Sequence, residues 1–392
     1  MGRVIGGEVI EDARRRGRVV LEVLPGDIVT SLARETALRL GILLADGPIE
    51  KPAPVKTDGP TAARRVLYKR SARWVAPGKG PHHRGRRFTK IACVGAGGVG
   101  SNVAHLVATA HLADEIMLID IAPGLAAATA MDLNHTAGIT GVGTRCNGGE
   151  DLSLVAGADV VVVTAGQARR PGMTRADLIN VNGRVIGQAA EAIRTQAPDA
   201  VVIVVTNPLD EMTVKMLRAT GFPHGRVLGM AGTLDSGRFR TALAAAAGVT
   251  PADVQAITLG SHGDEMVPIT SRARIRGRPL DVWLPQDQID ACVKEAVIGG
   301  GQVVALKKRG SATIAPAHAA VELLDYMRGA RQGPVPVSVM LNGEYGIRDV
   351  VLGMPANLGM SGLLSVEEMR LTPAETKALH AAAAAVRTRL EI

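Results

Sequence analysis

A glycine-rich loop lies between a short apolar segment and a helical pattern in this 392-residue chain. Residues 90–96 are apolar enough for a buried strand, and residues 98–112 carry apolar side chains at helical spacing. At the junction of these two segments, Gly95, Gly97 and Gly100 have the spacing of the dinucleotide-binding fingerprint. There, the first glycine permits a tight turn, the second lets a pyrophosphate approach the backbone, and the third lets helix pack on strand. The loop therefore predicts a unit that opens with strand, turn and helix.

The region from residue 90 to residue 250 alternates short apolar segments with helical patterns. Repeated βα units of this kind predict an α/β fold with a doubly wound, mostly parallel sheet, a Rossmann domain. We expect strands at 90–95, 115–120, 159–165, 200–206 and 226–229, and helices at 98–112, 123–134, 174–196, 208–219 and 233–247. The remainder mixes both types, which predicts an α+β substrate domain. Its expected strands are 253–259, 267–275, 335–342 and 349–355, and its expected helices are 286–308, 315–329 and 372–389.

We expect four parts along the chain. They are a small N-terminal extension (1–45), a basic Pro/Gly-rich linker (46–88), a dinucleotide-binding domain (89–232) and a catalytic domain (233–392). The extension carries helical patterns at 8–17 and 30–40 and strand patterns at 18–24 and 42–44, with a Pro-Gly turn at 25–27. No internal repeat is apparent in the sequence.

The net charge of +8 is concentrated in the first part of the chain. Residues 1–89 hold 18 Lys and Arg against nine Asp and Glu, whereas the remainder is nearly neutral. Nine of those basic residues lie at 59–89, which has no acidic residue and could bind an anionic polymer by counterion release. Only Tyr68, Trp74 and Phe88 are available there for stacking on bases, so the composition favours a linker over nucleic-acid binding.

The cysteines and the hydropathy pattern indicate the compartment. Three widely spaced cysteines, Cys93, Cys146 and Cys292, have no metal-ligand spacing and fit a reducing environment, so we expect no metal site. The sequence shows no apolar stretch of about 18 residues and no signal-peptide pattern at its start. We therefore expect a soluble, cytoplasmic protein without a membrane segment.

Polar residues follow several of the predicted strands. Asp120 ends the second strand, where a carboxylate accepts hydrogen bonds from the adenosine ribose and repels a 2′-phosphate, which favours NAD over NADP. Arg169, Arg170 and Arg175 surround a Pro-Gly turn after the third strand and suit bidentate binding of a carboxylate, although a solvated basic loop has the same composition. Asn207 ends the fourth strand, where it could donate to a substrate or simply end the strand.

Two further motifs supply acid–base chemistry. Asp235 and Arg238 lie three residues apart on one face of a predicted helix, as would an ordinary intrahelical ion pair. His262 is flanked by small residues after an apolar strand, so its ring has room to reach a cleft. With a carboxylate on one ring nitrogen, the other nitrogen can exchange a proton with an alcohol or carbonyl oxygen.

From about residue 89 onward, the chain resembles the lactate/malate dehydrogenase family and, within it, the lactate-dehydrogenase-like malate dehydrogenases of bacteria. The matching segments include KIACVGAGGVGSNVA, VVVTAGQARRPGMTRADLINVN, VVTNPLD, GTLDSGRFRTALA, LGSHGDEMVP and LNGEYGIRDVVLGMPANLG.

The resemblance implies specific roles. His262 would be the proton donor and acceptor, Asp235 would orient it, and Arg238 would bind the C1 carboxylate of the substrate. Arg175 would polarise the reacting oxygen, and Asn207 would help to hold the substrate. The implied NAD-binding residues are Gly95, Ala96, Gly97, Gly98, Val99, Gly100, Asp120, Asn182, Val205, Thr206 and Asn207.

Substrate choice depends on Arg169 in this resemblance. Malate dehydrogenases carry arginine at that position, where it binds the second carboxylate, and lactate dehydrogenases typically carry glutamine. The resemblance therefore implies interconversion of (S)-malate and oxaloacetate, with an L-lactate dehydrogenase as the alternative. It also implies a homo-oligomer, either a dimer or a tetramer.

Two glycine-rich positions depart from the family pattern. Gly237 stands where alanine is more usual, and the run Gly299-Gly300-Gly301-Gln302 has more glycine than usual and lacks a glutamate. We expect neither departure to touch the catalytic residues.

The N-terminal extension has a weaker resemblance of its own. Its segment PGDIVTSLARETALRLGI, within residues 1–45, is similar to segments that recur in enzymes encoded with bacterial microcompartments. This resemblance implies docking to a shell or core partner, and thus a location in the microcompartment lumen.

Overall fold

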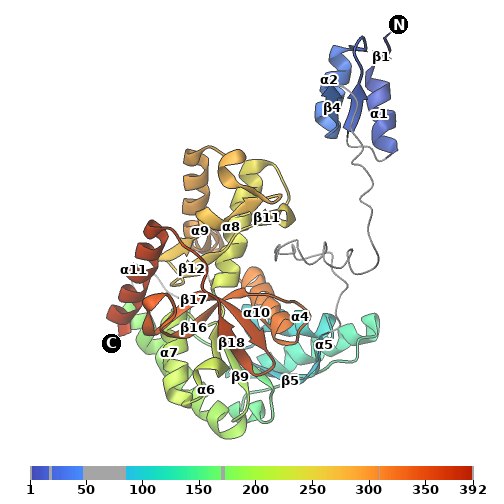
Figure 1. The fold of residues 1–392 in the computed structure, drawn as a ribbon. Helices are drawn as coiled ribbons and strands as arrows, with labels where there is room; N and C mark the ends of the chain where they lie inside the picture. The colour runs from blue at the N-terminus through green and yellow to red at the C-terminus, as the bar shows by residue number, and fades with distance from the viewer. Residues whose placement is uncertain (1, 17–19, 47–84, 169–172, 309, 391–392) are drawn as a thin grey trace, which may run out of the picture. The chain divides into compact units, whose positions relative to one another are not determined.

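The computed structural model describes residues 2–16, 20–46, 85–168, 173–308 and 310–390. The chain forms two compact units, Met1–Trp74 and Val75–Ile392 (Figure 1). Most of the expected linker lies outside the described residues.

The N-terminal unit consists of two strand–helix–strand halves. Strand β1 of the first half pairs in parallel with β3 of the second, and β2 pairs in parallel with β4. Equivalent strands thus pair with each other, so the N-terminal unit repeats one order of elements, although no repeat is apparent in the sequence. The elements are β1 (Val4–Ile5), α1 (Gly7–Arg15), β2 (Val20–Val23), β3 (Ile28–Val29), α2 (Ser31–Leu40) and β4 (Leu43–Asp46).

The N-terminal unit has its own small core. Ile5, Ile10 and Ala33 are almost fully buried in it and come from both halves. The Thr30 side chain accepts a hydrogen bond from the Ala33 N–H (3.1 Å), so it caps the start of α2. Gly41 ends that helix in the left-handed conformation. Local sequence signals therefore set both ends of α2.

The large unit is built on one mixed sheet. Its parallel half has the order β7-β6-β5-β8-β9-β10, which is the strand order of dinucleotide-binding folds. Its strands are β5 (Phe88–Val94), β6 (Ala113–Ile119), β7 (Arg145–Gly149), β8 (Val160–Val163), β9 (Val201–Val204) and β10 (Val227–Gly229). The connecting helices are α4 (Gly98–Thr109), α5 (Leu125–Thr140), α6 (Arg175–Gln196) and α7 (Leu209–Thr220).

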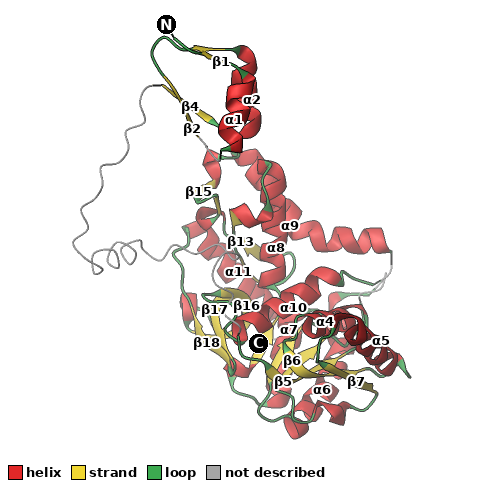
Figure 2. Ribbon diagram, turned by 90° about the vertical axis from the view of Figure 1, so that its right-hand side faces the viewer, coloured by secondary structure: helices red, strands yellow, loops and turns green. Residues whose placement is uncertain are grey.

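Helices cover both faces of the parallel half. Alternate strand residues belong to different cores: Ile91 and Cys93 face one, and Ala92 and Val94 face the other. Helices α4 and α5 pack on the first face, and α6 packs on the second (Figure 2). This two-sided burial explains why these strands are continuous apolar runs.

The second half of the large unit extends the same sheet with antiparallel strands. Strand β16 pairs with β10, β17 with β16, and β12 and β18 both with β17. The remaining strands are β11 (Val254–Gln255), β12 (Thr258–Gly260), β13 (Met266–Pro268), β14 (Arg274–Ile275), β15 (Arg278–Pro279), β16 (Val335–Asn342), β17 (Arg348–Gly359) and β18 (Gly362–Val366). The remaining helices are α8 (Gly232–Ala247), α9 (Gln286–Lys307), α10 (Ile314–Met327) and α11 (Pro373–Leu390).

Candidate active site

The glycine loop joins β5 to α4 by a close backbone approach. Gly95 has φ +104°, and a Cβ there would lie 2.6 Å from the Thr164 hydroxyl. A Cβ on Gly100 would lie only 1.8 Å from the Gly95 carbonyl oxygen. Only glycine therefore fits at these two positions.

The middle of the loop leaves room for an anion. A Cβ on Gly97 would have no atom within 4 Å, and no side chain caps α4 at this residue. The first N–H groups of the helix are therefore free to bind a phosphate. Ala96 is buried, and Val99 packs on the core, so these two residues contribute backbone rather than side chain to the loop. The loop fits the pyrophosphate of a dinucleotide.

Asp120 follows β6 and is tied to the glycine loop. One carboxylate oxygen accepts a hydrogen bond from the Ala96 N–H (2.7 Å), and the other accepts one from the Ala122 N–H (2.9 Å). Each carboxylate oxygen can accept a second hydrogen bond. The side chain can therefore brace the loop and still accept from a ribose hydroxyl.

Asn182 on α6 is fully buried and connects two loops at the carboxyl edge of the sheet. Its amide nitrogen donates to the Asn207 carbonyl oxygen (2.6 Å) and to that of Gln167 (3.1 Å), and its oxygen accepts from the Gln167 N–H (2.8 Å). The Thr206 hydroxyl donates to the Ala165 carbonyl oxygen (2.7 Å). These side chains therefore fix the loops beside the expected nicotinamide position, and Val205 is buried next to them. Asn207 itself is exposed at this edge.

The fold brings His262 and Asp235 into direct contact. His262 Nδ1 lies 2.8 Å from Oδ2 of Asp235, which is almost fully buried on α8. The other oxygen of Asp235 accepts a hydrogen bond from Arg238 Nη1 (3.1 Å). Since Nδ1 is taken by Asp235, Nε2 is the ring nitrogen left for a substrate.

The charge on His262 is controlled by its neighbours. Burial is the largest single influence and lowers the pKa of His262, but the charge and hydrogen bond of Asp235, with the charge of Asp210, outweigh it. The net result is a pKa above the ordinary value of histidine. The neighbouring carboxylates thus stabilise the charged imidazolium relative to the neutral ring.

Asp210 on α7 was not among the predicted site residues. It accepts hydrogen bonds from the His262 backbone N–H (2.7 Å) and from the Ser338 hydroxyl (2.9 Å). Burial and the adjacent Glu211 raise the pKa of its carboxyl to about 6. Asp210 ends the segment VVTNPLD, one of the segments that carry the family resemblance. An acidic residue at the start of a helix is usually exposed to solvent, so nothing in the sequence indicated that Asp210 is buried.

Arg238 lies against the glycine run of α9. A Cβ on Gly300 would lie 3.2 Å from Nη2 of Arg238, and one on Gly299 would lie 3.6 Å from its Cδ. Our expectation that the run does not touch the catalytic residues is therefore wrong for these two positions. Sequence spacing could not show it because α8 and α9 meet only in the tertiary fold. Gly237 and Gly301 have no atoms within 4 Å of an added Cβ.

Arg175 is the first residue of α6. Its guanidinium lies 3.5 Å from Oε1 of the fully buried Glu211 and 3.8 Å from where a Cβ on Gly263 would stand. Arg175 is thus brought next to the His262 loop. Arg169 lies outside the described residues.

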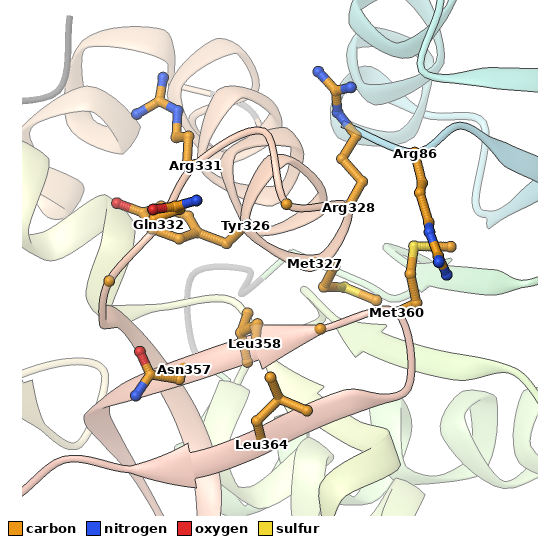
Figure 3. A pocket seen from close by; sticks show the side chains of 13 residues that line it. Arg86, Tyr326, Met327, Arg328, Arg331, Gln332, Asn357, Leu358, Met360 and Leu364 are labelled. Atoms are coloured by element: carbon orange, nitrogen blue, oxygen red, sulfur yellow. The ribbon is translucent and has the colours of Figure 1, made fainter. Parts of the chain in front are cut away.

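A pocket in a different region holds none of the predicted site residues. It lies where the end of α10 meets β17 and β18 (Figure 3). Arg86, Arg328 and Arg331 lie along it, and Arg328 and Arg331 form ion pairs with Asp325. This pocket is separate from the candidate active site.

The family follows from two matches that together span the large unit. Residues 89–229 match the lactate/malate dehydrogenase NAD binding domain, and residues 232–391 match the alpha/beta C-terminal domain of the same family. The chain belongs to the lactate/malate dehydrogenase family. The resemblance and the fold class inferred from the sequence are therefore confirmed, and the NAD-binding domain confirms the expected cofactor at the level of the family.

Relatives and solved structures agree with this assignment. The malate dehydrogenase of Trichormus variabilis is 41% identical over 305 residues, which cover 78% of this chain and 94% of the relative. A Cryptosporidium parvum lactate dehydrogenase, crystallised with lactic acid and nicotinamide adenine dinucleotide, aligns with a TM-score of 0.75 at 37% identity. A C. parvum malate dehydrogenase aligns with a TM-score of 0.75 at 36% identity. Each structural alignment covers 78% of this chain and 98% of the solved chain.

The described residues contain no group of three or more His, Cys, Asp or Glu that could hold a metal ion. None of the described helices is long and apolar enough to cross a membrane.

Proposed function

We propose that this chain is an NAD-dependent malate dehydrogenase that interconverts (S)-malate and oxaloacetate. The observation that carries the proposal is the hydrogen-bonded set of His262, Asp235 and Arg238 at the carboxyl edge of a dinucleotide-binding sheet. Relatives named malate dehydrogenase, about 40% identical over three quarters of the chain, support the substrate.

The chemistry divides among these side chains. NAD held by the glycine loop and Asp120 would supply the acceptor for the hydride that leaves C2 of malate. His262 takes the hydroxyl proton at Nε2 and returns it during reduction, and Asp235 stabilises the charged ring. Arg238 binds the C1 carboxylate through its planar fork of donors. Arg175 polarises the C2 oxygen, and the Asn207 amide donates to the substrate.

Arg169 is proposed to select the substrate by pairing with its second carboxylate. We expect Arg169→Gln to lower kcat/KM for oxaloacetate and raise it for pyruvate, because a buried charge left without its partner costs roughly 3–5 kcal/mol. Steady-state rates with oxaloacetate and pyruvate, each with NADH and NADPH, measure this. An unchanged ratio would remove Arg169 as the selector, and a wild-type preference for pyruvate would favour the lactate dehydrogenase alternative.

We propose that residues 1–45 dock the enzyme to a microcompartment shell or core partner. The N-terminal unit has its own core yet exposes large apolar side chains, among them Leu32, Leu38 and Leu43. A fusion of residues 1–60 to a fluorescent protein should form foci in cells that make such compartments. Diffuse fluorescence would contradict docking and leave the cytoplasm as the location.

Salt-sensitive retention of residues 59–89 on nucleic acid would support the anionic-polymer alternative.

We also propose that the protein forms a homo-oligomer. Apolar side chains on α9, including Ile298, Val304 and Leu306, are exposed in the single chain, which supports a subunit contact along this helix. Light scattering of the purified protein distinguishes monomer, dimer and tetramer.

A further inference from the structure

Two adjacent carboxylates, Asp210 and Glu211, are fully buried in the first turn of α7. Successive helical residues point about 100° apart, so the two side chains reach different partners. Asp210 holds the backbone of His262. Glu211 instead contacts two arginines, and the proposed mechanism gives it no role.

The Glu211 carboxylate joins three parts of the fold. Its Oε1 lies 2.5 Å from Nε of Arg389 on α11 and 3.5 Å from Nη2 of Arg175 on α6. Arg389 also donates to Glu265 (2.7 Å) and to the Ser261 hydroxyl (3.0 Å), which lie on either side of His262 in the sequence. Two arginines thus face two carboxylates, and Arg389 alone cannot neutralise both.

The contact between Glu211 and Arg175 leaves one donor and one acceptor of this pair without a hydrogen bond. Among the described residues, Nε of Arg175 and Oε2 of Glu211 are both buried without a hydrogen-bond partner. The guanidinium lies between this carboxylate and the loop at Gly263. Because a guanidinium has five N–H donors, a carboxylate on one side leaves other donors free for a substrate oxygen.

We infer that Glu211 is a positioning residue that holds the Arg175 guanidinium beside the His262 loop, where it polarises the reacting oxygen. Arg389 supplies the counter-charge that allows Glu211 to be buried. This inference rests on the proposed function, because it needs Arg175 to act on the substrate.

The first test is Glu211→Gln, which keeps the shape of the side chain and removes its charge. We expect kcat for oxaloacetate reduction to fall about tenfold, since misplacing a group that acts in the transition state lowers the chemical rate. KM for oxaloacetate and NADH affinity should change little, whereas the melting temperature should fall, because Arg389 loses one of its two carboxylate partners. Glu322→Gln is the matched control, because it removes a carboxylate on α10 that pairs with Arg331 and should leave kcat unchanged.

A double-mutant cycle tests whether Glu211 acts through Arg175. In an Arg175→Ala background, Glu211→Gln should cause no further loss of kcat. If Glu211→Gln alone fails to fold, Glu211→Gln with Arg389→Met removes both charges together and should show the same tenfold loss.

Two outcomes would overturn the inference alone: a wild-type kcat in the Glu211→Gln variant, or independent losses in the cycle. A wild-type chain without oxaloacetate reductase activity would instead overturn the proposed function, and this inference with it.

Discussion

The two oxygens of Asp235 serve different cations. One holds His262 at Nδ1 and the other accepts from Arg238, so a single buried carboxylate fixes both the proposed proton carrier and the arginine proposed to bind the substrate. A change at Asp235 should therefore affect the acid–base step and substrate binding together.

Replacing Asp235 with asparagine should shift the pH dependence of the reaction. In the proposed mechanism oxaloacetate reduction needs protonated His262, so its rate should fall as pH rises through the pKa of this histidine. Asp235 raises that pKa, and Asp235→Asn should therefore move the fall in kcat/KM to lower pH. Rates from pH 5 to 10 measure the shift.

His262→Ala supplies the control for that measurement. We expect it to reduce turnover by about 10²–10⁴-fold while NADH binding is kept. A profile for Asp235→Asn that matches the wild type would contradict the role of this carboxylate.

Residues of the site differ in how far the sequence could predict them. His262 and Asp235 are found from motifs, because their spacing and their glycine neighbours are local. Asp210 and Glu211 are not, since their burial comes from Ser338 and Arg389, which lie 128 and 178 residues away in the sequence.

At the scale of elements, local signals predicted the parallel strands better than the rest of the sheet. Strand β8 is a run of valines buried on both faces, which is an unambiguous pattern. Strand β7 was missed because its sequence, RCNGG, is not apolar, and its place at the edge of the sheet makes an apolar run unnecessary. The expected strand 253–259 is divided into β11 and β12, which belong to different sheets. That division depends on tertiary pairing.

The glycine run of α9 leads to a prediction about how closely this helix packs against Arg238. Gly300→Ala should crowd the Arg238 guanidinium and raise KM for oxaloacetate several-fold, because the new Cβ would lie 3.2 Å from Nη2. Gly301→Ala is the matched control on the same helix, where an added Cβ meets nothing within 4 Å. It should leave KM unchanged and stabilise the protein by about 0.5–1 kcal/mol. Equal KM values for the two variants would contradict the contact.

At the scale of the molecule, the large unit contains every described residue of the candidate site. Its contacts begin before β5, since the Arg86 N–H donates to the Arg328 carbonyl oxygen (2.9 Å), and Phe88, the first residue of β5, is fully buried. The sequence predicts that the enzyme starts near residue 89, and these contacts place Arg86 and Phe88 within the large unit as well.

Truncating the chain from its N-terminus should show that the large unit is active without the N-terminal unit. A chain that begins at Gly85 keeps these contacts, so its kcat/KM for oxaloacetate should stay within about twofold of the full-length value. A chain that begins at Lys90 loses Phe88, whose burial is worth about 3–5 kcal/mol in comparable large-to-small substitutions. It should melt at a markedly lower temperature in a thermal scan. Loss of activity in the longer truncation would show that catalysis needs residues 1–84.

The paired halves of the N-terminal unit have a consequence for association between chains. Each ladder takes one strand from each half, so neither half completes a ladder alone. The halves meet through the short turn at Pro25 and Gly26. If that turn opened, the first half of one chain could pair with the second half of another through the same hydrogen bonds, and the N-terminal unit would then link two enzymes by exchange of identical segments.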